Sequence, residues 1–331
     1  MFELLFIVFS RLLKNTMGRS GLTINGEIWD DMMEVASYLI GLSVLRLTLS
    51  GIVSSWLREV PCLFQLFSKG LTPSQARKLH ENLWYTIWHS VSFLFGALHI
   101  YSQPWVVDLF FEWDTEALVD GYPQSAGSMG FKRFYLFELG FWLSCCLFLG
   151  FETKRKDFSQ MIIHHTSTVI LVAFSYLLDF CRGGILIMIL HDAGDVLLYS
   201  AKSLQYRGWN KLADILFILF AAIFFFTRLF LLPVGLWYPL AYSLWKGTES
   251  PGMFVIMEYG QHWKLALLTG VFGCLILLHC NWGAIIIRMI ARAIRSKGEK
   301  SAGNEGDPRS DDEVETVNPI DTRRVITKME K

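Results

Sequence analysis

Two neighbouring apolar runs, FSQMIIHHTSTVILVAFSYLLD at residues 158–179 and GILIMILHDAGDVLLYSAKS at residues 184–203, decide the fold class. Each is close to the ~20 residues that an α-helix needs to cross the hydrocarbon layer of a bilayer. Because only a short connection separates them, we expect two antiparallel membrane helices that lie side by side.

Similar runs lie at about 34–56, 82–101, 132–152, 211–232 and 264–288, which makes seven expected spans. The composition agrees, since 53% of the 331 residues are hydrophobic and only 18% are charged. The stretch 232–245 is also apolar, but Pro233 and Pro239 interrupt it, so we expect it to continue the sixth span as a lumenal or re-entrant segment. The formal net charge of zero gives no sign of nucleic-acid binding.

The orientation of the chain in the membrane follows from the charges of the loops between the expected spans. Every second loop is basic, and the loop after the second span is acidic. The positive-inside rule then requires an odd number of spans, a lumenal N-terminus and a cytosolic C-terminus. We divide the chain into an N-terminal lumenal or interfacial segment (1–33), a first membrane helix with its cytosolic loop (34–81), a six-helix membrane domain (82–295) and a disordered cytosolic tail (296–331).

Titratable side chains interrupt the two deciding runs: His164, His165, His191, Asp192 and Asp195. A charged residue at the bilayer centre costs at least ~2.5–3.5 kcal/mol, so these groups need partners or a function. The helical rise places His164 about 12 Å, Asp195 about 10 Å and Asp192 about 15 Å from the cytosolic boundary. The histidines and aspartates can therefore meet at one level.

Several interpretations of this cluster stay open at this point. It could be a polar network that joins two helices, or a mononuclear zinc site on His164 or His165 with Asp192 or Asp195. The eight histidines make none of the closely spaced boxes of membrane di-iron enzymes, and we expect no metal. Outside the cluster, Glu138, Arg182 and Arg228 could pair with one another, and we expect them to have a packing role. Arg46 could extend its charged end to the membrane surface or pair with a residue that the sequence does not identify.

The run KRKDFSQMIIHH at 154–165, continued by LHDAGD at 190–195, resembles the Lag motif of ceramide synthases, which belong to the TLC-domain superfamily. The similarity extends to ENLW at 81–84, QPW at 103–105, TRL at 227–229 and LHCNW at 278–282, and covers about residues 34–295. Two departures are Asp179, near a usual asparagine, and Tyr85, where arginine is common.

The resemblance implies an all-α polytopic membrane protein in which six of about seven helices form a barrel around a central lipid cavity. It implies residence in the endoplasmic reticulum and transfer of a fatty acyl group from acyl-CoA to a sphingoid long-chain base. The family's catalytic signature corresponds here to His164, His165, Asp192 and Asp195. Acyl-CoA is then a co-substrate, and no further cofactor is implied.

The chemistry of the residues agrees with this implication. Amide formation from a thioester needs a general base for the amine, and histidine has a suitable pKa. An aspartate bonded to the imidazole would fix its tautomer. The same histidine could instead attack the thioester and form an acyl-imidazole, and the sequence does not choose between the two routes.

Six residues are candidates for substrate binding. Lys154, Arg155 and Lys156 lie where the phosphates of CoA could dock. His191, Asn281 and Trp282 are candidates through the motifs that contain them. The possible partners also include a second copy, a different subunit and membrane lipid. The main alternative function is a non-catalytic TLC-domain protein that binds or transfers lipids, and another is a proton-coupled transporter.

Overall fold

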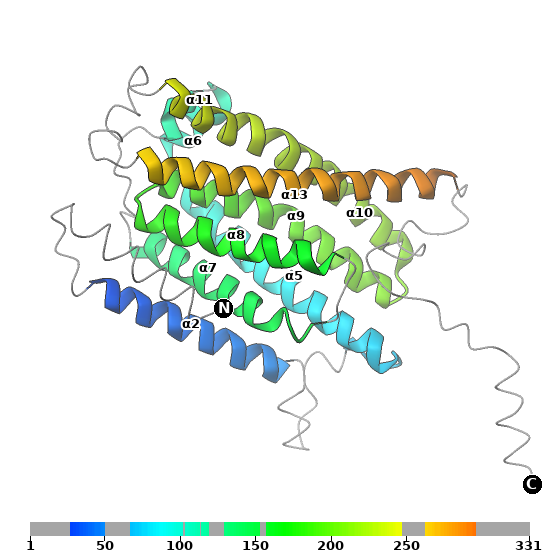
Figure 1. Cartoon of the computed structure of the whole chain (residues 1–331). Helices are drawn as coiled ribbons and strands as arrows, with labels where there is room; N and C mark the ends of the chain where they lie inside the picture. Colours follow the sequence, from blue (N-terminus) through cyan, green and yellow to red (C-terminus); the bar gives the residue numbers. More distant parts are fainter. Residues whose placement is uncertain are drawn as a thin grey trace, which may run out of the picture.

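The computed structural model describes residues 27–49, 67–101, 103–112, 114–118, 129–152, 157–246 and 262–295, and helices dominate them (Figure 1). In chain order they are α2 (Glu27–Leu49), α5 (Pro73–Ile100), α6 (Pro104–Phe111), η1 (Thr115–Leu118), α7 (Met129–Phe148), α8 (Phe158–Leu177), α9 (Cys181–Tyr206), α10 (Asn210–Phe226), η2 (Thr227–Trp237), α11 (Tyr238–Lys246) and α13 (His262–Arg295).

Five of the described helical stretches are long and apolar enough to cross a membrane: Trp29–Leu49, Phe158–Leu177, Cys181–Tyr206, Asn210–Trp245 and His262–Arg292. Helices α5 and α7 occupy the places of the expected second and third spans and are not among these five stretches; α7 contains the charged residues Lys132, Arg133 and Glu138. The expectation of an all-α polytopic membrane protein is confirmed. The count of seven spans and the barrel of six helices stay predictions, as do the domain boundaries.

The first helix begins earlier than the apolar pattern indicated, at Glu27 instead of residue 34. Its first turns are acidic, and negative side chains are favourable near a helix N-terminus. Asp31 also has partners there: the Lys132 ammonium lies 2.6 Å from its carboxylate, and the Tyr176 hydroxyl donates to it at 2.8 Å. The polar start of α2 is therefore fixed against α7 and α8.

The prolines near residue 233 do not break the sixth span. Helix α10 runs without interruption into the π-helical segment η2, which contains Pro233, and then into α11. A proline in an α-helix removes one hydrogen bond and clashes with the preceding turn. The looser π-helical turn accommodates it here, so residues 210–245 form one long candidate span.

The helices pack in a closed circuit. Contacts join α5 to α7, α7 to α8, α8 to α13, α13 to η2, α10 to α9, and α9 back to α5. Helix α2 lies outside this circuit against α7, at one edge of the bundle in Figure 1. Gly140 of α7 permits that contact, because a Cβ there would meet the Cβ of Tyr38 at 2.7 Å. Such close approach through small residues is typical of membrane helices.

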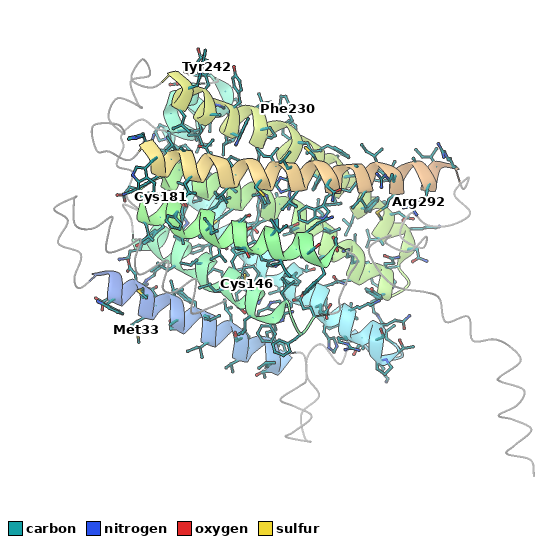
Figure 2. The ribbon with its side chains drawn as sticks, viewed as in Figure 1. Met33, Cys146, Cys181, Phe230, Tyr242 and Arg292 are labelled. Carbon is teal, nitrogen blue, oxygen red and sulfur yellow. The ribbon has the colours of Figure 1, made fainter. Side chains whose placement is uncertain are left out.

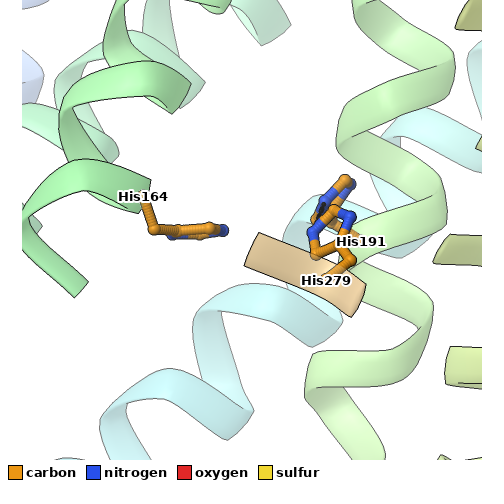
Figure 3. A group of neighbouring side chains, drawn as sticks. All are labelled: His164, His191 and His279. Atoms are coloured by element: carbon orange, nitrogen blue, oxygen red, sulfur yellow. Dashed lines mark hydrogen bonds between the residues drawn. The ribbon is translucent and has the colours of Figure 1, made fainter. Parts of the chain in front are cut away.

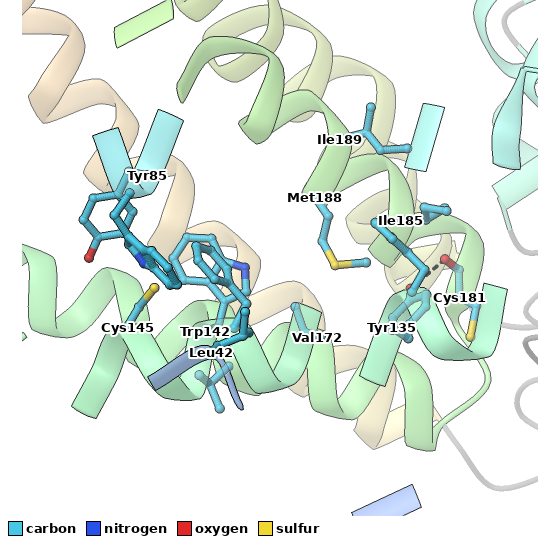
Figure 4. Packing of buried hydrophobic residues seen from close by; sticks show 14 residues of the cluster. Leu42, Tyr85, Tyr135, Trp142, Cys145, Val172, Cys181, Ile185, Met188 and Ile189 are labelled. Atoms are coloured by element: carbon cyan, nitrogen blue, oxygen red, sulfur yellow. Dashed lines mark hydrogen bonds between the residues drawn. The ribbon is translucent and has the colours of Figure 1, made fainter. Parts of the chain in front are cut away.

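The interior is apolar and aromatic. One cluster of buried side chains brings together α2, α5, α7, α8 and α9, and includes Trp142 and Tyr135, whose hydroxyl is bonded to the Cys181 carbonyl oxygen (Figure 4). Large apolar side chains also lie on the outside of the bundle, among them Met33 and Phe230 (Figure 2). An apolar exterior is what contact with lipid requires.

The turn between α8 and α9 is tight and brings the two deciding runs together as expected. Asp179 has a positive φ of 57°, the left-handed conformation that asparagine, aspartate and glycine adopt most readily. The Phe180 amide donates to the Ser175 carbonyl oxygen at 2.8 Å, which closes the turn. The residues on α8 and α9 that carry the candidate chemistry are thus set at a common depth.

Candidate active site

The candidate site lies at one end of an internal cavity between α8, α9, α11 and α13. His164, His191 and Asp192 form its polar end. Its walls are otherwise made mostly of apolar side chains, including Leu171, Val172, Ile187, Met188, Leu240, Leu265, Leu268, Phe272 and Leu275. From His164 to Ser175, which also lines it, α8 rises by about 16 Å. The cavity is thus long, apolar and closed off by imidazole and carboxyl groups at one end.

The two adjacent histidines of α8 face different surroundings. His164 lines the cavity, whereas His165 is not among its lining residues. The Nδ1 of His165 lies 2.7 Å from the Met161 carbonyl oxygen; since a carbonyl only accepts, this nitrogen carries the proton and Nε2 has the lone pair. Both rings pack edge-on against Trp142. Adjacent residues on a helix point about 100° apart, so only one of the two can face the cavity, and it is His164.

Asp192 pairs with a histidine that sequence reasoning missed. Its carboxylate accepts a hydrogen bond from Nδ1 of His89 on α5 at 2.7 Å, and each side chain is only 2% exposed. The Ser92 hydroxyl lies 2.5 Å from the other oxygen of Asp192 and also contacts Glu138. We expected an aspartate to fix the tautomer of the catalytic histidine, and the histidine bonded to Asp192 is His89.

Asp195 and Arg228 form the second buried ion pair of the site, with 2.7 Å between the carboxylate and the guanidinium. The same Arg228 nitrogen donates to the His191 carbonyl oxygen at 2.8 Å. The possible pairing of Arg228, Glu138 and Arg182 with one another does not occur among the described residues. Arg182 donates to the Ala117 carbonyl oxygen, and Glu138 accepts from Ser92, because the three side chains face different neighbours.

The ring of Trp282 on α13 packs edge-on against the His164 ring, with 5.3 Å between the ring centres, and the indole N–H donates to Asp157 at 3.3 Å. Asn281, the other candidate on this helix, is exposed and donates to Gln160 at 2.9 Å. The structure thus brings Trp282 to the site and keeps Asn281 on the outer surface. Lys154, Arg155 and Lys156 lie outside the described residues.

A third imidazole lies behind His191 and is not among the residues that line the cavity. Nε2 of His279 on α13 lies 3.0 Å from Nε2 of His191 on α9. His164 lies across from this pair, as Figure 3 shows. One ring nitrogen from each histidine lies within 4.8 Å of the other two. His279 belongs to the LHCNW motif, but we assigned it no role from the sequence.

Arg46, whose partner the sequence did not identify, is bonded to Glu152 at 2.5 Å, just beyond the end of α7. The Tyr85 hydroxyl donates to the same carboxylate at 2.5 Å. The guanidinium also lies over the Phe148 ring, 4.6 Å from its centre. These contacts attach α2 to the bundle away from the cavity, so Arg46 belongs to the framework and not to the site.

Comparisons with known proteins agree with this architecture. A family model described as the TLC domain matches residues 78–288. Ceramide synthase 4 of Bos taurus is 35% identical over 255 residues, which are 77% of this chain and 59% of that relative. Ceramide synthase 5 of Homo sapiens is 32% identical over 260 residues, 78% of this chain and 62% of that relative. Ceramide synthase LOH2 of Arabidopsis thaliana is 28% identical over 293 residues, 87% of this chain and 94% of that relative. The chain spans less than two thirds of the length of the first two.

Proposed function

Because the chain belongs to the TLC-domain family, we propose that it is a ceramide synthase. It would transfer a fatty acyl group from acyl-CoA to the amine of a sphingoid long-chain base and release (dihydro)ceramide. The relatives named ceramide synthase support this function. The single observation that carries it is the position of His164 at the polar end of a long apolar cavity.

The cavity suits an acyl chain. Its walls are aliphatic and aromatic along about 16 Å of α8. Each methylene group moved from water into such surroundings contributes about 0.8 kcal/mol, so a long chain would bind strongly without any polar contact. The thioester carbonyl would then lie at the polar end, within reach of the imidazole of His164.

Two routes for His164 keep atoms and charge in balance. As a general base, its imidazole takes a proton from the amine while the amine nitrogen bonds to the thioester carbon and the carbon–sulfur bond breaks; the departing CoA thiolate then regains a proton. As a nucleophile, its ring nitrogen forms an acyl-imidazole and releases CoA before the amine attacks. The second route needs protection from water, which agrees with an imidazole that is only 7% exposed.

The two aspartates would act through their neighbours. Asp192 holds His89, and Asp195 holds Arg228, which in turn contacts the His191 backbone. Both pairs tie α9 to adjacent helices at the depth of the cavity's polar end. We therefore assign Asp192 and Asp195 as residues that position the site. Docking of CoA on Lys154, Arg155 and Lys156, location in the endoplasmic reticulum and a cytosolic C-terminus stay predictions.

The test is an activity assay on the full chain, purified in detergent and incubated with sphinganine and a panel of acyl-CoAs. Mass spectrometry should detect N-acyl product from the wild type. His164→Ala should lower the rate by at least ~100-fold, the usual contribution of a general base. His262→Ala, an exposed histidine at the start of α13, is the matched control and should keep full activity.

Two results would overturn the proposal. Full activity in His164→Ala would remove this residue from the chemistry. Absence of product with every acyl-CoA, from a folded sample that binds lipid, would favour a non-catalytic TLC-domain protein that binds or transfers lipids.

A further inference from the structure

Three histidines from three helices converge beside the polar end of the cavity. His164, His191 and His279 are 7%, 6% and 0% exposed. Their nearest ring nitrogens lie within 4.8 Å of one another. They are 27 and 88 positions apart in sequence, so neither helical periodicity nor a local motif accounts for their meeting. Figure 3 shows His164 facing the His191–His279 pair across a gap.

The hydrogen bonds that the structure describes leave two ring nitrogens of the cluster without partners. The Nδ1 of His191 donates to the Ile187 carbonyl oxygen at 2.6 Å, so Nε2 of the neutral ring accepts the hydrogen bond from Nε2 of His279 at 3.0 Å. The Nδ1 atoms of His164 and His279 are buried and have no hydrogen-bond partner among the described residues. A buried polar atom without a partner costs about 1–3 kcal/mol, and in the described part of the chain no hydrogen bond at Nδ1 fixes the tautomer of either ring.

The charged groups around the cluster tolerate a bound cation. Arg228 is the nearest described guanidinium, and its charge is paired with Asp195 at 2.7 Å. Asp192, which lines the same cavity, contributes a carboxyl group beside His191. A divalent ion would therefore not face an unpaired positive charge.

We propose that His164, His191 and His279 form a transition-metal site with a preference for Zn²⁺, and that its fourth position opens on the apolar cavity. Three neutral imidazoles with one open position are a common zinc ligand set, and imidazole nitrogens bind Zn²⁺ at ~2.0–2.1 Å. Tetrahedral geometry then sets the nitrogens about 3.3 Å apart. The His191–His279 pair is already at 3.0 Å, so only His164 has to move inward, by side-chain rotation.

The carbonyl of Ile187 strengthens this assignment. Metal-binding histidines usually donate their second ring nitrogen to a carboxylate or a backbone carbonyl, which fixes the tautomer and orients the ligand. His191 has this arrangement. The ligand set differs from the histidine–aspartate site that spacing alone left open, because Asp192 and Asp195 are engaged by His89 and Arg228.

The site has a consequence for activity that rests on the proposed function. A metal bound to His164 occupies the lone pair that this residue would use as base or nucleophile. Zn²⁺ binding and acyl transfer would then exclude each other, and the metal would inhibit the enzyme. Metal binding itself does not depend on the activity, so the two proposals can fail separately.

The test uses the full chain, purified in detergent with an affinity tag that contains no histidine and treated with a chelator. Co²⁺ is titrated in and followed by the visible absorbance of tetrahedral cobalt, with bound metal counted by elemental analysis. We expect one equivalent, displaced by one equivalent of Zn²⁺. His191→Ala and His279→Ala should weaken binding at least ~10-fold. The matched controls His165→Ala, next to His164 on α8, and His262→Ala, on the helix of His279, should bind as the wild type does.

A measurement on the wild type keeps the proposal open to refutation if a variant does not fold. Zinc X-ray absorption should show three imidazole ligands with nitrogen at about 2.0 Å. Sulfur in the coordination shell, no bound equivalent, or binding that His262→Ala abolishes would each overturn the site. Inhibition of N-acyl transfer by Zn²⁺, reversed by chelator, should accompany binding; binding without inhibition would leave the site in place and remove the inhibitory consequence.

Discussion

The buried pair between His89 and Asp192 gives the sharpest test of how the site is held together. The perturbation is His89→Ala, which removes the 2.7 Å contact from a carboxyl group that is 2% exposed. Ser92 would remain as its neighbour at 2.5 Å. Removing one partner of a buried ion pair typically costs ~3–5 kcal/mol, because the other partner is left without compensation. We expect a loss of this size in the free energy of unfolding.

A double-mutant cycle isolates the interaction from the general effect of truncating a buried side chain. Asp192→Asn alone should cost about 1–3 kcal/mol, since it keeps one oxygen and the shape of the side chain. The double variant should be more stable than the sum of the two losses predicts, by at least ~1.5 kcal/mol. That coupling would exceed the ~0.6 kcal/mol average of hydrogen bonds between membrane helices.

The assay is equilibrium unfolding of the purified protein in mixed micelles with increasing sodium dodecyl sulfate, followed by far-ultraviolet circular dichroism. A control cycle uses His99 in place of His89 as the mutated histidine. His99 lies on the same helix, and its Nδ1 is bonded to the Phe95 carbonyl oxygen instead of to a carboxylate. His99→Ala with Asp192→Asn should be additive within about 0.5 kcal/mol. The same additivity in the His89 cycle would falsify the ion pair as a link between α5 and α9.

Three further predictions concern the framework. Gly140→Leu should detach α2, because its side chain would collide with Tyr38; protease digestion between α2 and α5 should become faster, and an unchanged rate contradicts the packing. Arg46→Met should cost about 3–5 kcal/mol in the unfolding assay by leaving Glu152 without its 2.5 Å cation, and adding Glu152→Gln should restore most of the loss; no recovery argues against the pair. Burial raises the pKa of the Asp179 carboxyl in the folded protein. Above that folded-state pKa the charged carboxylate lowers the free energy of unfolding, and this loss disappears once the pH falls below the ordinary pKa of about 3.9. Asp179→Asn should therefore raise the melting temperature most at neutral pH, and a gain that grows toward acid pH refutes this reasoning.

Hydropathy predicts most of the long helices because it reports a property of each segment by itself. The apolar runs at 158–179 and 184–203 correspond to α8 and α9, and their short connection correctly indicates neighbours. The sequence does not reveal the start of α2, because its acidic first turns are polar yet bonded to other helices. It also does not reveal that Pro233 stays inside a helix, because the π-helical turn that accepts it depends on tertiary packing.

The candidate site could be predicted where its residues lie on consecutive helices, and at Trp282 through the motif that contains it. His164 and His191 are brought together by the α8–α9 turn, and their common depth follows from helical rise. His89 and His279 lie on α5 and α13, and no periodicity states which distant helix a membrane histidine will face. A titratable residue inside an apolar helix was nevertheless a usable signal at both positions, because such residues need partners.

The π-helical segment Thr227–Trp237 has a consequence for how the cavity is shaped. Each of its turns takes in one residue more than an α-helical turn, so the chain rotates less at every step and the following residues emerge on a shifted face. On that face, Leu240 lines the cavity and the Trp237 indole donates to the Thr269 carbonyl oxygen at 2.9 Å. Deleting a single residue upstream would rewind the segment and turn both side chains away. The shape of the cavity thus depends partly on the number of residues in this segment. Inserting or deleting one residue could change that shape without altering any of the side chains that line the cavity.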